Sequence, residues 1–141
     1  MKLVDRHGAR VLEYPKGDPY LKDMKRTLGH VGNVLGLDWN PKEKDLLASA
    51  GQDGTVRFWS SEFKKMQDIL VVKPLRGGKP PAISQIKFVP ESKLFAITGS
   101  DGMIRFYDTK GPWLRPSLVS FAGSFGLGSL FRKSLMLIRP M

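Results

Sequence analysis

Cysteine is absent from the 141 residues, and histidine occurs only as His7 and His30. The lack of cysteine excludes disulfide bonds and thiolate zinc sites, and it suits a reducing compartment. No pair of carboxylates stands at a recognisable catalytic spacing, so the groups that acid–base catalysts and metal centres use are scarce. We therefore expect no metal site, no cofactor and no small-molecule substrate.

Long apolar runs are missing as well. A membrane-spanning helix needs roughly 20 apolar residues, and the nearest candidate, residues 117–131, is shorter and carries three glycines. The chain also reaches charged residues at once, at Lys2, Asp5 and Arg6, and has no signal-peptide core. These absences predict a soluble, intracellular protein with no membrane segment.

Acidic residues are fewer than basic ones, at 13 against 23, which gives a formal net charge of +10. Such an excess favours an acidic partner: nucleic acid, an acidic protein face or an anionic membrane. The basic residues are, however, spread in singles and pairs such as Lys25-Arg26 and Lys64-Lys65. Because no run is long enough for a localisation or heparin-type motif, we interpret the charge as a solvated basic surface, with a dedicated nucleic-acid site as the alternative.

Against these absences stands an internal repeat. Residues 46–59 align with residues 94–107, so that Asp53 matches Asp101 and Arg57 matches Arg105, each pair 48 positions apart. A period in this range is typical of stacked supersecondary units, four-stranded propeller blades among them. Within each unit, an Asp-Gly turn separates two runs of β-forming residues, as in a hairpin. The repeat therefore predicts an all-β fold.

The residues of the first unit resemble a WD40 repeat. Those that carry the resemblance are Gly29-His30, Val34, Leu37, Trp39, Pro41, Leu47-Ala48-Ser49, Asp53-Gly54 and Phe58-Trp59. In that family a buried tetrad of polar side chains ties each blade together, and the matching residues here are His30, Ser49, Asp53 and Trp59. The resemblance implies a partial WD40 β-propeller with one complete blade flanked by two incomplete blades and an irregular C-terminal tail.

An Asp-His-Ser set also invites comparison with hydrolases. The nucleophile-elbow pattern is absent, however, and Asp53, His30 and Ser49 occupy the structural positions of the repeat. We therefore interpret the tetrad as structural, assign no catalytic residue and expect a protein that is not an enzyme.

The second unit departs from the repeat pattern. It has no Gly-His pair, Ile97 stands in the place of Ser49, and Tyr107 stands in the place of Trp59. Asp101 would therefore lack its usual histidine, and we expect this blade to be less tightly tied than the first.

The repeat register divides the chain into four parts. Residues 1–24 supply the last two strands of an incomplete blade, 25–72 a complete blade, and 73–110 an incomplete blade of three strands. Residues 111–141 form a Gly/Ser/Leu-rich tail outside the propeller, either artefactual or poorly ordered, or else a partner-binding segment. Because a partial ring exposes sheet faces and strand edges, we expect either a truncated gene model or completion by partners.

Further segments resemble one branch of the family, the WD repeat-containing protein 70 or gastrulation-defective group. They are Val4-Asp5-Arg6-His7-Gly8, residues 16–24, Trp39-Asn40-Pro41-Lys42 and residues 73–79. The resemblance implies a non-catalytic nuclear scaffold that binds proteins, in the DNA double-strand-break response or as a ubiquitin-ligase adaptor. The Trp-Asp-x-Arg sequence of ligase adaptors is missing at Trp59-Ser60 and only echoed at Tyr107-Asp108, so we do not expect ligase docking by this part of the chain.

The loop of Lys73, Arg76 and Lys79 is the candidate partner-binding site. Its glycines and prolines hold three positive charges between two blades, where they could meet phosphates or an acidic peptide. Two alternatives stay open. The loop is either a solvated connector or the contact surface of a spliceosomal component that touches RNA or DNA.

Overall fold

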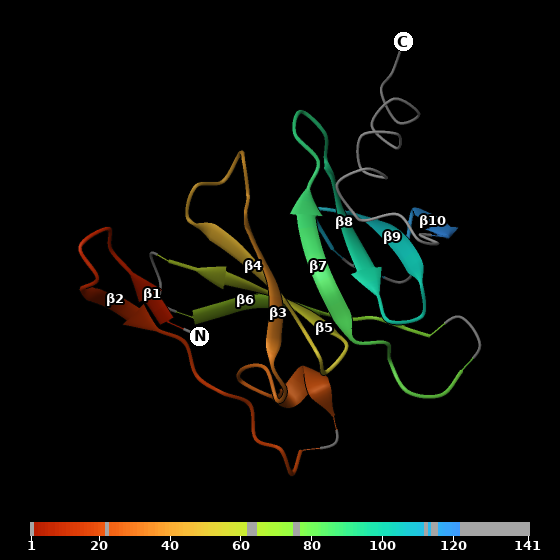
Figure 1. Cartoon of the computed structure of the whole chain (residues 1–141), viewed down its shortest axis with the longest axis horizontal. Helices are drawn as coiled ribbons and strands as arrows, with labels where there is room; N and C mark the ends of the chain where they lie inside the picture. Colours follow the sequence, from red (N-terminus) through yellow and green to blue (C-terminus); the bar gives the residue numbers. More distant parts are fainter. Residues whose placement is uncertain are drawn as a thin grey trace.

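The computed structural model describes residues 2–21, 23–61, 65–74, 77–111, 113 and 116–121. These residues form ten β-strands and one short 3-10 turn, η1 (Met24–Arg26), so the predicted all-β class is confirmed (Figure 1). The strands are β1 (Lys2–Val4), β2 (Arg10–Glu13), β3 (Val34–Trp39), β4 (Leu46–Gly51), β5 (Thr55–Ser60), β6 (Lys65–Val71), β7 (Ile83–Phe88), β8 (Leu94–Gly99), β9 (Met103–Asp108) and β10 (Leu118–Phe121).

The first sheet is an antiparallel meander in the order β3-β4-β5-β6. The turn between β4 and β5 forms where predicted, since Gly54 adopts a φ of 77° that favours glycine and the Asp53 carboxylate accepts the backbone N–H of Thr55 at 3.2 Å. A Cβ at Gly54 would lie 2.5 Å from Cβ of Pro80, so the turn sits directly against the loop that leads to the second sheet.

The second sheet has the order β7-β8-β9-β10, and β10 corrects the sequence prediction. Three strands were expected, with a tail outside the propeller from residue 111 onwards. Instead, Leu118 pairs with Phe106 and Ser120 with Ile104 across an antiparallel ladder. The physical reason is local: β10 is a short run of β-forming residues beside the open edge of β9, whereas the glycines that dominated the prediction begin at residue 123. Residues 122–141 of the predicted tail lie outside the described part of the chain.

The hairpin of β1 and β2 forms a separate two-stranded sheet. The Asp5 carboxylate closes its turn by accepting the backbone N–H groups of His7 and Ala9, at 2.8 and 2.9 Å. The hairpin is followed by Tyr14, which packs on Trp59 with ring centroids 4.7 Å apart and donates its hydroxyl to the carbonyl of Ser60. That these strands end a preceding blade stays a prediction.

The two four-stranded sheets share one hydrophobic core and meet chiefly through β3 and β7, which run side by side in Figure 1. A Cβ at Gly36 of β3 would lie 3.0 Å from Cα of Gln85 of β7, so the two strands approach closely. The carboxylate of Asp38 accepts the backbone N–H of Phe88 across the same junction, at 2.8 Å. The sheets are thus arranged as neighbouring blades of a partial β-propeller, as expected.

One face of strand β3 packs against β7, whereas the other face is apolar and largely uncovered. The side chains of Leu35, Leu37 and Trp39 alternate along the strand and remain 47%, 53% and 42% exposed. Alternation places them together on the same face of the sheet.

Within the described residues, no helix is long and apolar enough to cross a membrane.

Candidate functional site

A buried chain of hydrogen bonds links the loop before β3 to three successive elements of the first sheet. Trp59 Nε1 donates to Ser49 Oγ at 2.8 Å, Ser49 Oγ lies 2.6 Å from His30 Nε2, and His30 Nδ1 lies 3.1 Å from Asp53 Oδ1. The structure therefore brings together all four residues of the predicted tetrad.

The direction of the protons follows from the chemistry of the partners. The indole N–H can only donate, so Ser49 accepts from Trp59 and directs its own hydroxyl proton to His30 Nε2. The Nδ1 atom then carries the imidazole proton and donates it to the Asp53 carboxylate. This assignment gives every member a donor or acceptor role that its partner complements, which makes the chain a satisfied buried network.

Asp53 is the most heavily bonded member of the network. Its side chain is 5% exposed and also accepts hydrogen bonds from the backbone N–H of Val31 at 3.0 Å and the hydroxyl of Thr55 at 2.7 Å. Burial by itself raises the pKa of the Asp53 carboxyl, but the hydrogen bonds from His30, Thr55 and Val31 outweigh it and hold the pKa well below its ordinary value. Asp53 is thus an ionised carboxylate at neutral pH.

Arg57 extends the network and was missed by the sequence analysis. Its side chain is fully buried; Nε donates to the Thr55 hydroxyl at 3.2 Å and Nη1 to the Thr27 carbonyl at 3.0 Å. Its Nη2 atom also lies 3.8 Å from Asp53 Oδ2. Burial lowers the pKa of Arg57, and the negative charge of Asp53 offsets this shift only in part. A guanidinium nevertheless keeps its positive charge at neutral pH. The recurrence of arginine 48 positions later was the sequence signal that could have revealed it.

The second sheet pairs its turn aspartate without a histidine. Asp101 accepts two hydrogen bonds from the guanidinium of Arg105, at 3.2 and 2.5 Å. Burial raises the pKa of Asp101, whereas the bonds from Arg105 and the Met103 N–H outweigh it, so the pKa lies below its ordinary value. The side chain of Asp101 is 30% exposed, six times as much as that of Asp53.

In the second sheet, the residues that correspond to Ser49 and Trp59 make apolar contacts. Ile97 is fully buried, and Tyr107 stacks on Phe95 with ring centroids 5.6 Å apart. The polar chain of the first sheet is therefore replaced by packing along β8 and β9.

The geometry of the tetrad does not suit catalysis. Ser49 is fully buried, and its hydroxyl is engaged by both Trp59 and His30, so no substrate carbonyl can reach it without opening the sheet. Among the described residues, no group of three histidine, aspartate or glutamate side chains is placed to hold a metal ion.

The predicted basic loop lies beside a hollow of about 1120 Å³. Lys73 and Lys79 both line it, and the structure adds Lys25 from η1 to the same rim. Arg76, the third residue of the predicted site, lies outside the described residues.

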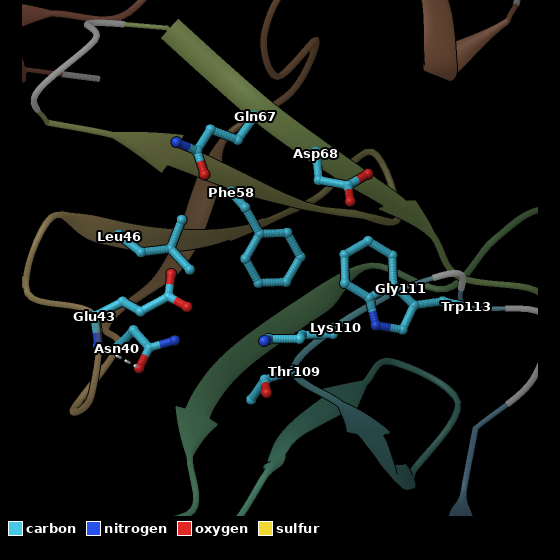
Figure 2. A pocket seen from close by; sticks show the side chains of 10 residues that line it. All are labelled: Asn40, Glu43, Leu46, Phe58, Gln67, Asp68, Thr109, Lys110, Gly111 and Trp113. Carbon is cyan, nitrogen blue, oxygen red and sulfur yellow. Dashed lines mark hydrogen bonds between the residues drawn. The ribbon is translucent and has the colours of Figure 1, made fainter.

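A smaller pocket of about 260 Å³ opens between the first sheet, with the loop after β3, and the loop that follows β9 (Figure 2). Trp113 stacks on Phe58 with ring centroids 4.9 Å apart and donates its indole N–H to the Asp108 carbonyl at 2.7 Å. Trp113 was not predicted as a site residue, because it falls in the part of the sequence that was assigned to the irregular tail.

Comparison with known proteins places this geometry in a family. The WD domain, G-beta repeat model matches residues 22–60 and 71–108. Gastrulation defective protein 1 homolog of Drosophila melanogaster is 34% identical over 109 residues, which cover 77% of this chain and 17% of that protein. WD repeat-containing protein 70 of Xenopus laevis is 36% identical over 108 residues, 76% of this chain and 17% of the relative, and the Homo sapiens protein of that name is 32% identical over 107 residues, 76% and 16%.

The chain spans about a sixth of the length of these curated relatives. The two matched stretches take in His30, Ser49, Asp53 and Trp59 of the first sheet and Asp101 and Arg105 of the second. Together, the repeat match, the two four-stranded sheets and the tetrad show that the chain belongs to the WD40 repeat family.

Proposed function

We propose that this chain is part of a non-catalytic WD40 scaffold that binds protein partners in a nuclear complex. The observation that carries the proposal is the burial of the tetrad. Its polar atoms bond to one another inside the sheet, where they stabilise a turn and present no reactive group to solvent. The chemistry available to a partner therefore lies on the loops and edges that this network holds in place.

The uncovered face of β3 supports a larger ring. One face of β3 is packed against β7, whereas Leu35, Leu37 and Trp39 are close to half exposed. Repeating the same blade-to-blade relation would cover them with another sheet, and contiguous apolar faces favour such burial. We propose that a neighbouring blade covers this face in the complete scaffold.

The similarity to WD repeat-containing protein 70 supports a role in the nucleus, in the DNA double-strand-break response or beside a ubiquitin ligase. Direct ligase docking through the described blades has weak support, because β5 ends in Trp59-Ser60 and β9 in Tyr107-Asp108. We therefore propose that the described blades bind other protein partners and that any contact with a ligase lies elsewhere in the scaffold.

Affinity capture tests the scaffold proposal. The full-length protein that carries this chain is tagged in its own cells, and partners are recovered separately from nuclear and cytosolic fractions. Wild type should capture nuclear proteins, Asp53→Ala should lose them because the network collapses, and the exposed Asp18→Ala should retain them. Failure of wild type to capture any nuclear protein, or equal capture by Asp53→Ala, would overturn the proposal.

Nucleic-acid binding is the second candidate, and the gathering of Lys25, Lys73 and Lys79 around one hollow favours it. RNA or DNA bound there would dissociate steeply as salt rises, with each phosphate contact adding about 0.7–0.9 to the logarithmic slope. Replacing Lys73, Arg76 and Lys79 by alanine should then weaken binding and flatten the salt dependence. Unchanged oligonucleotide affinity in that variant removes the loop from this role.

A further inference from the structure

The large hollow is a groove that follows the outer edge of the first sheet. Strand β6 is the last strand of that sheet, and its residues Ile69 and Val71 line the groove from one side. Met24 of η1 and Val31 line it as well, while Pro80 belongs to the segment that leads to β7. The surface of the groove is therefore largely apolar and is built by elements that the core already fixes.

Positive charge surrounds this apolar surface. Lys25, Lys73 and Lys79 are exposed and come from two segments far apart in the sequence. Within the described part of the chain, none of the three lies within ion-pair distance of a carboxylate. Their ammonium groups are thus available to an incoming ligand.

The two exposed carboxylates of the groove have local partners. Asp23 accepts the backbone N–H of Lys25 at 3.0 Å and lies 3.6 Å from the Arg26 guanidinium. Asp68 accepts the backbone N–H of Ile69 at 2.9 Å. These bonds hold both carboxylates against the wall, where they disfavour a ligand that carries a negative charge at every position. Asp53 also lines the groove, but its side chain is 5% exposed and accepts hydrogen bonds from His30, Val31 and Thr55.

Size and polarity narrow the occupant further. At about 1120 Å³ the groove lies just above the upper end of the ~300–1,000 Å³ that is typical of small-molecule sites, so it has room for a longer ligand. An extended peptide directs alternate side chains to opposite sides, so one set can reach the apolar wall while the other set meets the lysines. A nucleic-acid strand carries a phosphate at every nucleotide and would place some of them beside Asp23 and Asp68, whereas a peptide can direct apolar side chains to those positions.

We propose that this groove binds an extended acidic segment of a partner protein, in which apolar anchors alternate with carboxylates. The inference rests on the proposed scaffold function and names the partner chemistry of one surface of it. Lys25, Lys73 and Lys79 supply the charge complementarity, and Ile69 and Val71 supply the apolar contact.

A labelled peptide tests the groove directly. The probe is a fluorescein-tagged nonapeptide of alternating glutamate and leucine, measured by anisotropy against the folded chain. Two matched variants carry the same change of net charge: Lys25→Glu/Lys73→Glu/Lys79→Glu in the groove, and Lys16→Glu/Lys42→Glu/Lys44→Glu on exposed lysines outside it. All six lysines are exposed, so both variants should melt within a few degrees of wild type.

The groove variant should bind the peptide at least about 10-fold more weakly than wild type, and the control variant within about 2-fold, because only close charge pairs stabilise a complex strongly. A second peptide with lysine in place of glutamate should not bind. Equal losses in both variants, or no binding to wild type, would overturn the proposal. So would groove-dependent binding of a uridine 12-mer in place of the peptide.

The same variants separate this inference from the scaffold function. If the groove variant loses peptide binding, one subset of nuclear partners should disappear from affinity capture. If peptide binding is absent while wild-type capture of nuclear proteins persists, the groove proposal fails and the scaffold proposal stands.

Discussion

The two sheets stabilise the same turn with different side chains. Each has an Asp-Gly turn followed four positions after the aspartate by a buried arginine, Arg57 in the first sheet and Arg105 in the second. In the first, the aspartate is paired by His30 and Thr55 while Arg57 is directed mainly to Thr27. In the second, Arg105 donates two hydrogen bonds directly to Asp101.

The difference teaches that the arginine is the adaptable member of the blade. Where a histidine occupies the carboxylate, the guanidinium reaches past it and anchors the loop after η1. Where the histidine is absent, the guanidinium folds back onto Asp101 and, among the described residues, donates no hydrogen bond to the loop before β7. The second blade is therefore tied at its turn, but over a shorter span of the chain.

Removing Asp53 should have the largest effect. Asp53→Ala removes the acceptor of the His30 Nδ1 proton and of the Val31 backbone N–H, and it removes the negative charge near the buried Arg57. We therefore expect a loss of about 3–5 kcal/mol in the free energy of unfolding. Urea denaturation followed by tryptophan fluorescence measures it. The exposed Asp18→Ala serves as the control, at roughly 0.5 kcal/mol or less; similar losses in the two variants would break the comparison.

Ser49 tests whether the polar chain acts as one unit. Ser49→Ala leaves both the Trp59 indole N–H and His30 Nε2 without a partner, and should cost about 2–3 kcal/mol. A double-mutant cycle with Trp59→Phe should give a coupling of about 1 kcal/mol or more. The converse change, Ile97→Ser in the second sheet, should also destabilise, because no indole or imidazole awaits the hydroxyl; a gain in stability there would contradict this account.

Asp101 should matter less than its counterpart. Asp101→Asn weakens the pairing of Arg105, but water reaches the partly exposed carboxyl site, so we expect a loss of about 1–2 kcal/mol. Comparing the denaturation midpoints of Asp101→Asn and Asp53→Asn checks the order. The comparison between the sheets fails if Asp101→Asn proves the more damaging of the two.

The pH dependence of stability should show the smallest difference between the two aspartates. Both aspartates have folded-state pKa values below the unfolded value of about 3.9. Their stabilising effect is therefore complete above about pH 4 and is lost as pH falls through the folded pKa values. Between pH 5 and pH 3 we expect wild type to lose about 1 kcal/mol more than Asp53→Asn, and this gap should be narrower for Asp101→Asn. Identical pH profiles for wild type and both variants would contradict the assignment.

The repeat register was enough to predict most of the first blade. A period of 48 and an Asp-Gly turn align the strands of the two units. The tetrad of His30, Ser49, Asp53 and Trp59 came instead from the resemblance to WD40 repeats, because the second unit lacks three of its four residue types. Arg57 escaped because all six residues of β5 are buried. A strand covered on both faces shows no alternation, and a charged residue within it looks like a solvent-facing position.

Trp113 and β10 were not predicted from the sequence for a different reason. The loop between β9 and β10 spans residues 109–117, whereas the matching connection in the first sheet spans 61–64. The longer loop breaks the repeat, and the pairing of Leu118 with Phe106 depends on a strand edge that only the folded sheet presents. Long-range pairing of this kind leaves little trace in local sequence.

The close fit of Gly54 against Pro80 sets how freely these segments can change over evolution. A side chain at position 54 would meet both a backbone angle that favours glycine and an atom of the next blade's loop. Gly77 has a similar angle, with nothing within 4 Å of a Cβ placed there, so asparagine is an acceptable replacement. Substitutions should therefore be tolerated at Gly77 and selected against at Gly54, so the contact between the turn of one blade and the loop of the next should constrain evolution more than the exposed part of that loop does.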